Sequence, residues 1–402
     1  MPPNQRRAAR REEPVMLISA VQQVLHAIQT GKIIPIPVKK VILHIKPDLD
    51  AIAAYWLAKC FPPAFPGIET APVEFWSAGQ PPPDGRTWEE HEAEGTVCFD
   101  VAQGRFDHHP HGKCLDKCAV DLVADFLGLS EERTLEQILG FIRMHDLEGP
   151  KALTIALRQL GISEEIVEMA DLLQSFSLYS IVDSLRKRHH RKEHSLISEV
   201  CTILDFEYQK QVYFWTVVGP EFLSKATIHK IDTGTRLFKV AVIESKLHQV
   251  GSFSRTREGG FCAACIHRNP ATGHTFISGH LGSDQYVEVS KPLRVWDMQK
   301  RGIEAEYELE TLLLSEFTLN KVWYLPRNIR GEVFIVMNGG EKAVDVEISQ
   351  LSLDESLTGM HLGLDDEIFS NACPRTHCLY RQCPFYSFGL ERCNKIKQQA
   401  AQ

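Results

Sequence analysis

The residues best suited to chemistry are imidazoles and carboxylates gathered in two short segments, "HIKPDLD" and "FDVAQGRFDHH". Together the segments contain seven such residues: His44, Asp48, Asp50, Asp100, Asp107, His108 and His109. Nitrogen and oxygen donors in this mixture suit a pair of divalent ions. Two ions about 3.5–4 Å apart can activate a water and hold a phosphate for in-line attack. The segments therefore predict phosphoester hydrolysis.

The surrounding pattern predicts that strand ends position these residues. "KKVILHI" is an apolar run typical of a buried strand, and "LDAIAAYWLAKCF" repeats apolar residues at helical spacing, with Asp50 as its expected cap. "GTVCFDVAQG" repeats the arrangement, since a strand runs into Asp100 and a glycine-containing loop follows. Ligands commonly gather at the carboxyl ends of strands in α/β sheets. We expect the two segments to meet at one sheet edge.

The order H-x-x-x-D-x-D, then a strand-end Asp, then D-H-H resembles the DHH phosphoesterase superfamily. That superfamily includes RecJ-type nucleases, oligoribonuclease-type phosphoesterases and, with a variant third motif, family II inorganic pyrophosphatases. "VCFDVAQGRFDHHPHG" is also similar to a segment of Myg-type exonucleases. The resemblance covers roughly the first 150 residues.

The resemblance implies two Mn²⁺ ions, or two Mg²⁺ ions, and a ligand set for each. His44, Asp48 and Asp100 would hold the first ion. Asp50, the bridging Asp100 and His108 would hold the second.

Three further roles follow from the same resemblance. A fourth motif supplies one more Asp after helical segments, and the loosely matching "MHDLEG" offers Asp146. His109 would contact the scissile phosphate, and Asp107 would orient His108. "MHD" also suggests an HD-type phosphohydrolase, but that chemistry needs further His and Asp ligands in a helical context.

The favoured function is a two-metal phosphoesterase, a hydrolase that cleaves phosphodiester bonds in nucleic acid ends, oligonucleotides or related nucleotides. One alternative is hydrolysis of a small phosphate anhydride or nucleotide. Others are a nucleic-acid or partner-binding subunit on the same scaffold, and a relative that kept the fold but lost the chemistry.

Composition narrows the class of protein. The net charge is −8 over 402 residues, which argues against a broadly basic nucleic-acid coat. The chain has no membrane-length apolar stretch and no apolar secretory signal, so we expect a cytoplasmic protein with no membrane partner. Eleven cysteines without such a signal favour metal-bound or buried thiols over disulfides. The sequence leaves a homodimer as a possible assembly.

The pattern along the chain predicts an α/β fold whose first domain has a mostly parallel sheet with flanking helices. A smaller α+β domain and a cysteine-rich tail follow. We expect an N-terminal arm and helix (1–35), the metal-binding catalytic domain (36–180) and a helical linker (181–224). The substrate-side domain (225–350) and the tail (351–402) complete the chain.

Basic residues are candidates for substrate binding. "RKRHHRKEH" at 186–194 is either the solvated face of a helix, which we favour, or a patch that follows phosphates. In the second domain His280, Arg294 and Arg255 are the candidate substrate residues, because arginine can bind phosphate through two hydrogen bonds.

Four cysteines within twenty-one residues of the tail predict a second metal centre: Cys373, Cys378, Cys383 and Cys393. Zinc held by four thiolates and an iron–sulfur cluster are both compatible with the spacing. The third alternative is that the tail binds no metal.

Overall fold

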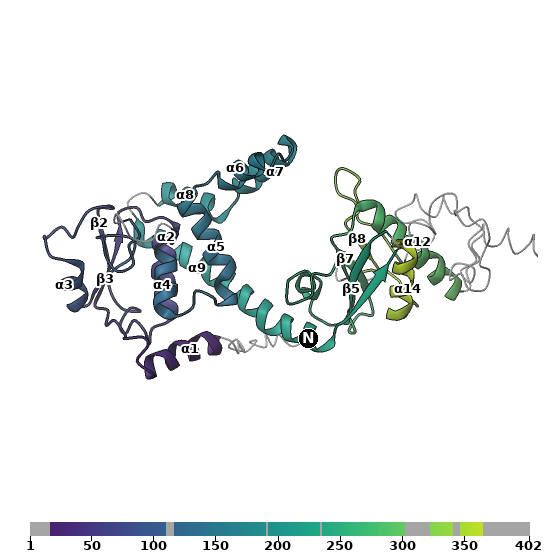
Figure 1. Cartoon of the computed structure of the whole chain (residues 1–402), viewed down its shortest axis with the longest axis horizontal. Helices are drawn as coiled ribbons and strands as arrows, with labels where there is room; N and C mark the ends of the chain where they lie inside the picture. The colour runs from purple at the N-terminus through teal and green to yellow at the C-terminus, as the bar shows by residue number, and fades with distance from the viewer. Residues whose placement is uncertain are drawn as a thin grey trace, which may run out of the picture. The chain divides into compact units, whose positions relative to one another are not determined.

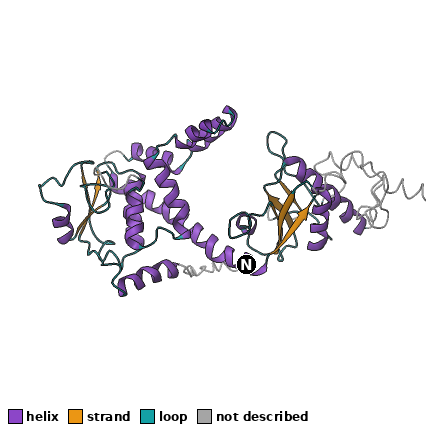
Figure 2. Ribbon diagram, viewed as in Figure 1, coloured by secondary structure: helices purple, strands orange, loops and turns teal. Residues whose placement is uncertain are grey.

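The chain folds into two compact units, which meet in sequence between Thr216 and Val217. A computed structural model describes residues 17–109, 116–189, 192–233, 235–301, 322–340 and 346–364 (Figure 1). Both units combine helices with a single sheet, as Figure 2 shows. The expected α/β class is confirmed at this level. No helix within the described ranges has the length and apolar character needed to cross a bilayer.

The first unit is mostly helical. Its elements in chain order are α1 (Leu17–Gln29), β1 (Lys40–His44), α2 (Leu49–Cys60), β2 (Val73–Trp76), α3 (Trp88–Ala93), β3 (Thr96–Cys98), α4 (Ala119–Leu127), α5 (Arg133–Leu147), α6 (Ala152–Gln159), α7 (Glu164–Gln174), α8 (Leu178–Arg188) and α9 (Glu193–Tyr213). A π-helical turn, η1 (Phe214–Val218), follows α9.

The sheet of the first unit has the order β2-β1-β3, and both pairs of strands are parallel. Val41 of the central strand pairs with Val73 on one side and with Val97 on the other. The expected parallel sheet is therefore confirmed. Since parallel strands end at the same edge, the carboxyl ends of β1 and β3 lie beside each other.

Helix α2 forms the centre of the first core. It is buried from Leu49 to Ala58 and packs against α4, α5 and α9. Trp56 donates its indole N–H to Asp205 of α9 over 2.8 Å. Leu196 and Val200 of α9 belong to the same apolar core.

The first unit extends beyond residue 180, where the sequence placed the end of the first domain. The expected linker 181–224 contains α9, which is part of the first unit and not a free connection.

The second unit has its own sheet and core. Its elements are α10 (Gly219–Lys225), β4 (Thr227–Asp232), β5 (Leu237–Glu244), α11 (Val250–Phe253), β6 (Ala264–Arg268), β7 (Thr275–Gly279), α12 (Ser283–Lys300), β8 (Ile335–Met337) and α14 (Leu353–Leu364). The strand order is β4-β5-β6-β7-β8, in which only β5 and β6 are parallel. Helices α12 and α14 pack together, and their Val289, Leu293 and Met360 join the core of the sheet.

Candidate metal centre

The turn after β1 positions the first group of candidate ligands. β1 ends at His44, and Pro47 precedes the start of α2. Asp48 is the N-cap of α2, because its side chain accepts a hydrogen bond from the Ala51 amide over 3.1 Å. The sequence assigned that cap to Asp50, which was wrong: Asp50 lies in the first turn of the helix.

The loop after β3 holds Asp100 in a demanding conformation. Asp100 has φ 54°, in the left-handed region that residues with a Cβ seldom adopt. Its amide donates to the Phe106 carbonyl over 2.9 Å, and the rings of Phe99 and Phe106 stack with centroids 5.5 Å apart. Both phenylalanines are buried in the first core. The core thus fixes the backbone on either side of this carboxylate.

One group of candidate ligands joins the two segments. Nε2 of His44 lies 3.6 Å from an oxygen of Asp48 and 3.6 Å from Oδ2 of Asp100. Nδ1 of the same ring is 3.0 Å from the Ile45 carbonyl, which can only accept, so Nδ1 carries the proton. That arrangement directs the lone pair of Nε2 toward the two carboxylates, as metal coordination requires.

A second group lies on the other side of Asp100. Nε2 of His108 is 3.4 Å from Oδ1 of Asp100, 3.3 Å from Oδ2 of Asp146 and 4.0 Å from Oδ2 of Asp50. Asp146 is in the last turn of α5. The structure therefore places all six predicted ligands in one cluster, with Asp100 shared between the two groups.

The N-terminus of α4 holds Asp50. The Ala119 and Val120 amides donate to its two oxygens over 2.6 and 2.9 Å. These amides would otherwise lack partners at a helix start, and the helix dipole there favours a negative charge. Cys118, directly before α4, has a thiol close to the carboxylates of Asp50 and Asp146.

His109 and Asp107 form a different contact from the one expected. Nδ1 of His109 is 3.0 Å from an oxygen of Asp107 and 3.2 Å from Asp100, and its amide also donates to Asp107 over 3.0 Å. Asp107 thus orients His109, whereas the sequence assigned it to His108. The neighbouring carboxylates of Asp100 and Asp107 raise the pKa of His109 to about 10.

The carboxylates of the cluster are close together and buried, so their negative charges repel one another when no cation is bound. Burial, followed by the charges of Asp100 and Asp146, raises the pKa of Asp50 well above its usual range. Burial and the charge of Asp100 raise the pKa of Asp146 to about 7. The pKa of Asp100 rises to about 6, mainly through burial. A divalent cation would remove this repulsion.

Unpaired polar atoms support the same conclusion. Oδ1 of Asp100, Nε2 of His108 and Oδ2 of Asp146 are buried and make no hydrogen bond within the part of the chain that the structure describes. Buried polar atoms without partners are rare and call for an explanation such as an ion. The donors are two imidazoles and four carboxylates, which suit Mn²⁺ or Mg²⁺. The residues therefore fit the implied metals.

One side of the cluster is accessible. The side chains of Asp100 and Asp50 are 2% and 1% exposed, whereas those of His109 and Asp48 are 54% and 33% exposed. A pocket of about 190 Å³ opens beside Asp48, Asp50 and Asp146. The rest of its wall comes from Leu49, Ile142, His145, Gly149, Pro150 and Tyr179. The cluster is therefore open to a ligand from this side.

Arg186 is a site residue that the sequence did not single out. It belongs to the basic run, and its guanidinium donates to the Lys46 carbonyl over 2.8 Å. Lys46 has φ 55°, so this bond supports a strained residue between His44 and Asp48. Lys187, the next residue of the run, is 77% exposed. Within its described residues, the run is therefore not the wholly solvated face that the sequence favoured.

The candidate substrate residues of the second unit come from three different segments of the chain. Arg294 is 4% exposed and donates to the Trp323 carbonyl over 3.2 Å, so this candidate substrate residue is buried within its own unit. Arg255 is half-buried and bonds Ser252, and His280 is exposed after β7. The four tail cysteines lie outside the described residues. No protein-family model matches this chain, and no curated protein matches it either.

Proposed function

We propose that the protein is a metal-dependent phosphoesterase of the DHH type, which hydrolyses phosphodiester bonds in nucleic acid ends or short oligonucleotides. The observation that carries the proposal is the shared position of Asp100 between two groups of ligands. Oδ2 of Asp100 faces His44, and Oδ1 faces His108. A bridging carboxylate of this kind is what a two-ion site needs.

Bound divalent ions would lower the pKa of a water and neutralise charge on the phosphate. The residues of the chain have their own tasks. His44, Asp48 and Asp100 would hold one ion, and Asp50, His108 and Asp146 would complete the other site with Asp100. Asp50 and Asp100 are almost fully buried, which limits the part of the cage that faces bulk water.

His109 is the residue placed to contact substrate. Its Nδ1 is hydrogen-bonded to Asp107 and lies 3.2 Å from Oδ1 of Asp100, which fixes the ring, while half of the side chain stays exposed. Its other ring nitrogen is then left for a phosphate oxygen. A charge-assisted hydrogen bond of that kind would orient the phosphate for attack.

The test is a panel of substrates with the full chain loaded with Mn²⁺. The panel contains single-stranded RNA and DNA, linear and cyclic dinucleotides, and pyrophosphate. We expect release of nucleotides from the short single strands, and no release after Asp50→Asn. The matched control is Asp183→Asn, an exposed carboxylate of α8 that pairs with Lys187.

Three results would contradict the proposal. Mn²⁺-loaded protein that cleaves nothing in the panel would exclude phosphoester hydrolysis as assigned. Turnover of pyrophosphate without turnover of any dinucleotide would instead favour the phosphate-anhydride alternative. Equal activity of Asp50→Asn and wild type would show that another site does the chemistry.

A further inference from the structure

Helices α6 and α7 present an apolar face that their own unit does not cover. They pack mainly against each other, and Figure 1 shows the pair projecting beyond α5 and α8. Nine large apolar side chains of this segment are 36–80% exposed: Leu153, Ile155, Leu160, Ile162, Ile166, Met169, Leu172, Leu173 and Phe176. Helices of this length are marginal in water without tertiary packing. A further surface is needed to cover them.

The exposed residues of α7 follow the spacing of a helix-pairing seam. Ile166, Met169 and Leu173 are three and four residues apart, and Ile162 and Phe176 continue the intervals just outside the helix. This spacing places the five side chains on one stripe. Val167 and Ala170, on another side of α7, are buried. The stripe is therefore additional to the contact between α6 and α7.

The charges of α7 argue for a protein partner. Helical spacing places Glu164, Glu168 and Asp171 on the side of α7 opposite the stripe. The segment from 151 to 176 carries four acidic and two basic residues, and Arg158 is paired with Glu164. An acidic helix pair is poorly suited to anionic lipid or nucleic acid. The fourth acid, Glu165, lies at the edge of the stripe.

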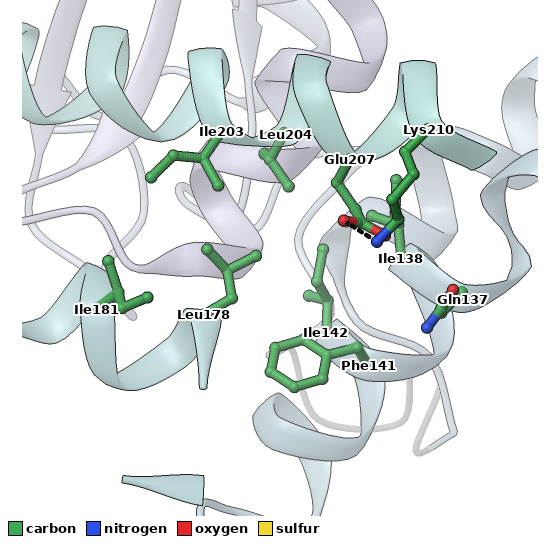
Figure 3. Close-up of a pocket in the computed structure, with 10 residues that line it drawn as sticks. All are labelled: Gln137, Ile138, Phe141, Ile142, Leu178, Ile181, Ile203, Leu204, Glu207 and Lys210. Carbon is green, nitrogen blue, oxygen red and sulfur yellow. Dashed lines mark hydrogen bonds and ion pairs between the residues drawn. The ribbon is translucent and has the colours of Figure 1, made fainter. Parts of the chain in front are cut away.

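The apolar surface continues along the chain from α7 into α8. Two residues after Phe176, Leu178 begins α8, and with Ile181 it lines an apolar groove of about 360 Å³. Figure 3 shows both side chains in the same groove as Phe141 of α5 and Ile203 of α9. A stable interface buries about 800 Å² per partner, so a dimer on this face would use the groove together with the stripe.

We propose that this face, formed by α7 and the start of α8, is a homodimer interface. In it, α7 of one protomer packs against α7 of its partner about a two-fold axis. A single stripe with heptad spacing is complementary to its own copy when the two helices run antiparallel. The stripe of α7 supplies none of the candidate metal ligands, and the proposal does not depend on the proposed hydrolysis.

Sedimentation velocity of the full chain tests the proposal over a range of concentrations. Wild type is expected at twice the monomer mass at tens of micromolar. Leu173→Glu should raise the dimer dissociation constant at least about 100-fold, because it places a charge in the seam. Leu223→Glu is the matched control, since Leu223 of α10 is 63% exposed and Leu173 is 73% exposed. The control should leave the dimer intact.

A second measurement does not depend on the folding of a charged variant. A benzophenone photo-crosslinking side chain placed at Leu172 should link two copies under light, whereas the same group at Leu223 should not. The two leucines have nearly equal exposure, 65% and 63%.

Three outcomes would overturn the proposal. They are a monomeric wild type at every concentration, a dimer that Leu173→Glu does not weaken, and cosedimentation with phosphatidylcholine–phosphatidylglycerol vesicles that Leu173→Glu abolishes. The last would assign the face to a membrane.

Discussion

Asp100 is the residue on which both halves of the candidate metal centre depend. It is 3% exposed and lies between His44 and His108. We expect Asp100→Asn to lower Mn²⁺ affinity and hydrolysis by more than about 100-fold, since loss of even an outer hydrogen-bond partner of a metal ligand costs 10–100-fold. Metal analysis after gel filtration, together with initial rates on a dinucleotide, measures both effects.

The same variant has a clear control. Asp183→Asn removes an exposed carboxylate of the same unit and should retain both metal and activity. Retention of two equivalents of Mn²⁺ by Asp100→Asn would show that Asp100 does not bridge the ions.

Arg186 acts on the metal centre through the backbone. Its guanidinium bonds the Lys46 carbonyl, and Lys46 stands between two candidate ligands in a left-handed conformation. We expect Arg186→Ala to raise the half-saturating Mn²⁺ concentration about fivefold, equivalent to the about 1 kcal/mol of one hydrogen bond. Arg188→Ala, an exposed arginine of the same helix, is the control. Isothermal titration of both metal-free variants with Mn²⁺ measures the effect. Equal Mn²⁺ affinities of Arg186→Ala and Arg188→Ala would refute this role of Arg186.

At the scale of elements, the sequence predicted those parts of the fold in which local pattern and tertiary role agree. β1, α2 and β3 are apolar runs that end at turn residues, and they form as expected. Helix α9 was harder to place. It begins beside the charged run "RKRHHRKEH", yet Leu196, Val200 and Leu204 recur at helical spacing and are buried. The charged residues before α9 obscured its apolar stripe.

The candidate ligands were predictable as a set, but their individual contacts were not. The cluster of carboxylates follows from the parallel strand ends. The sequence assigned the N-cap of α2 to Asp50, whereas the structure assigns it to Asp48. Either aspartate could have capped the helix, so the sequence pattern did not decide between them. Asp107 adjoins both His108 and His109, and only the loop backbone decides that it bonds His109. The role of Asp50 at the start of α4 joins residues 69 positions apart, which local pattern cannot show.

The start of α4 makes a prediction at the scale of elements. Buried Asp121 accepts two hydrogen bonds from Arg143 of α5, over 2.8 and 2.6 Å, and one from the Cys118 amide. Arg143→Met leaves this carboxylate without its cation. Because the Arg143 side chain is 44% exposed, we expect a loss of about 1–3 kcal/mol in the free energy of unfolding.

The variant should also weaken Mn²⁺ binding, because the amides that hold Asp50 follow Cys118 directly. Urea unfolding and Mn²⁺ titration provide the two measurements. Lys187→Met, which breaks the exposed pair with Asp183, should cost at most about 1 kcal/mol. If both variants were equally stable, the Asp121–Arg143 pair would not support α4.

At the scale of the whole molecule, each unit has a core of its own. The first core is built around α2, and the second around β5, β6, β7, α12 and α14. The six candidate metal ligands belong to the first unit. Separate cores predict separate unfolding transitions, because a domain with its own core can unfold as one cooperative unit.

Metal should therefore stabilise one transition and leave the other unchanged. Mn²⁺ at 100 times its dissociation constant adds about 2.7 kcal/mol to the state that binds it. Differential scanning calorimetry of the full chain, with Mn²⁺ and with a chelator, should show one transition that moves up and one that stays. Val240→Ala, a fully buried change in β5, should lower only the transition that Mn²⁺ leaves in place, by about 2 kcal/mol. If Mn²⁺ raised the midpoint of the transition that Val240→Ala lowers, the metal would bind outside the cluster around Asp100. If Mn²⁺ raised the midpoint of neither transition, the cluster would not bind Mn²⁺.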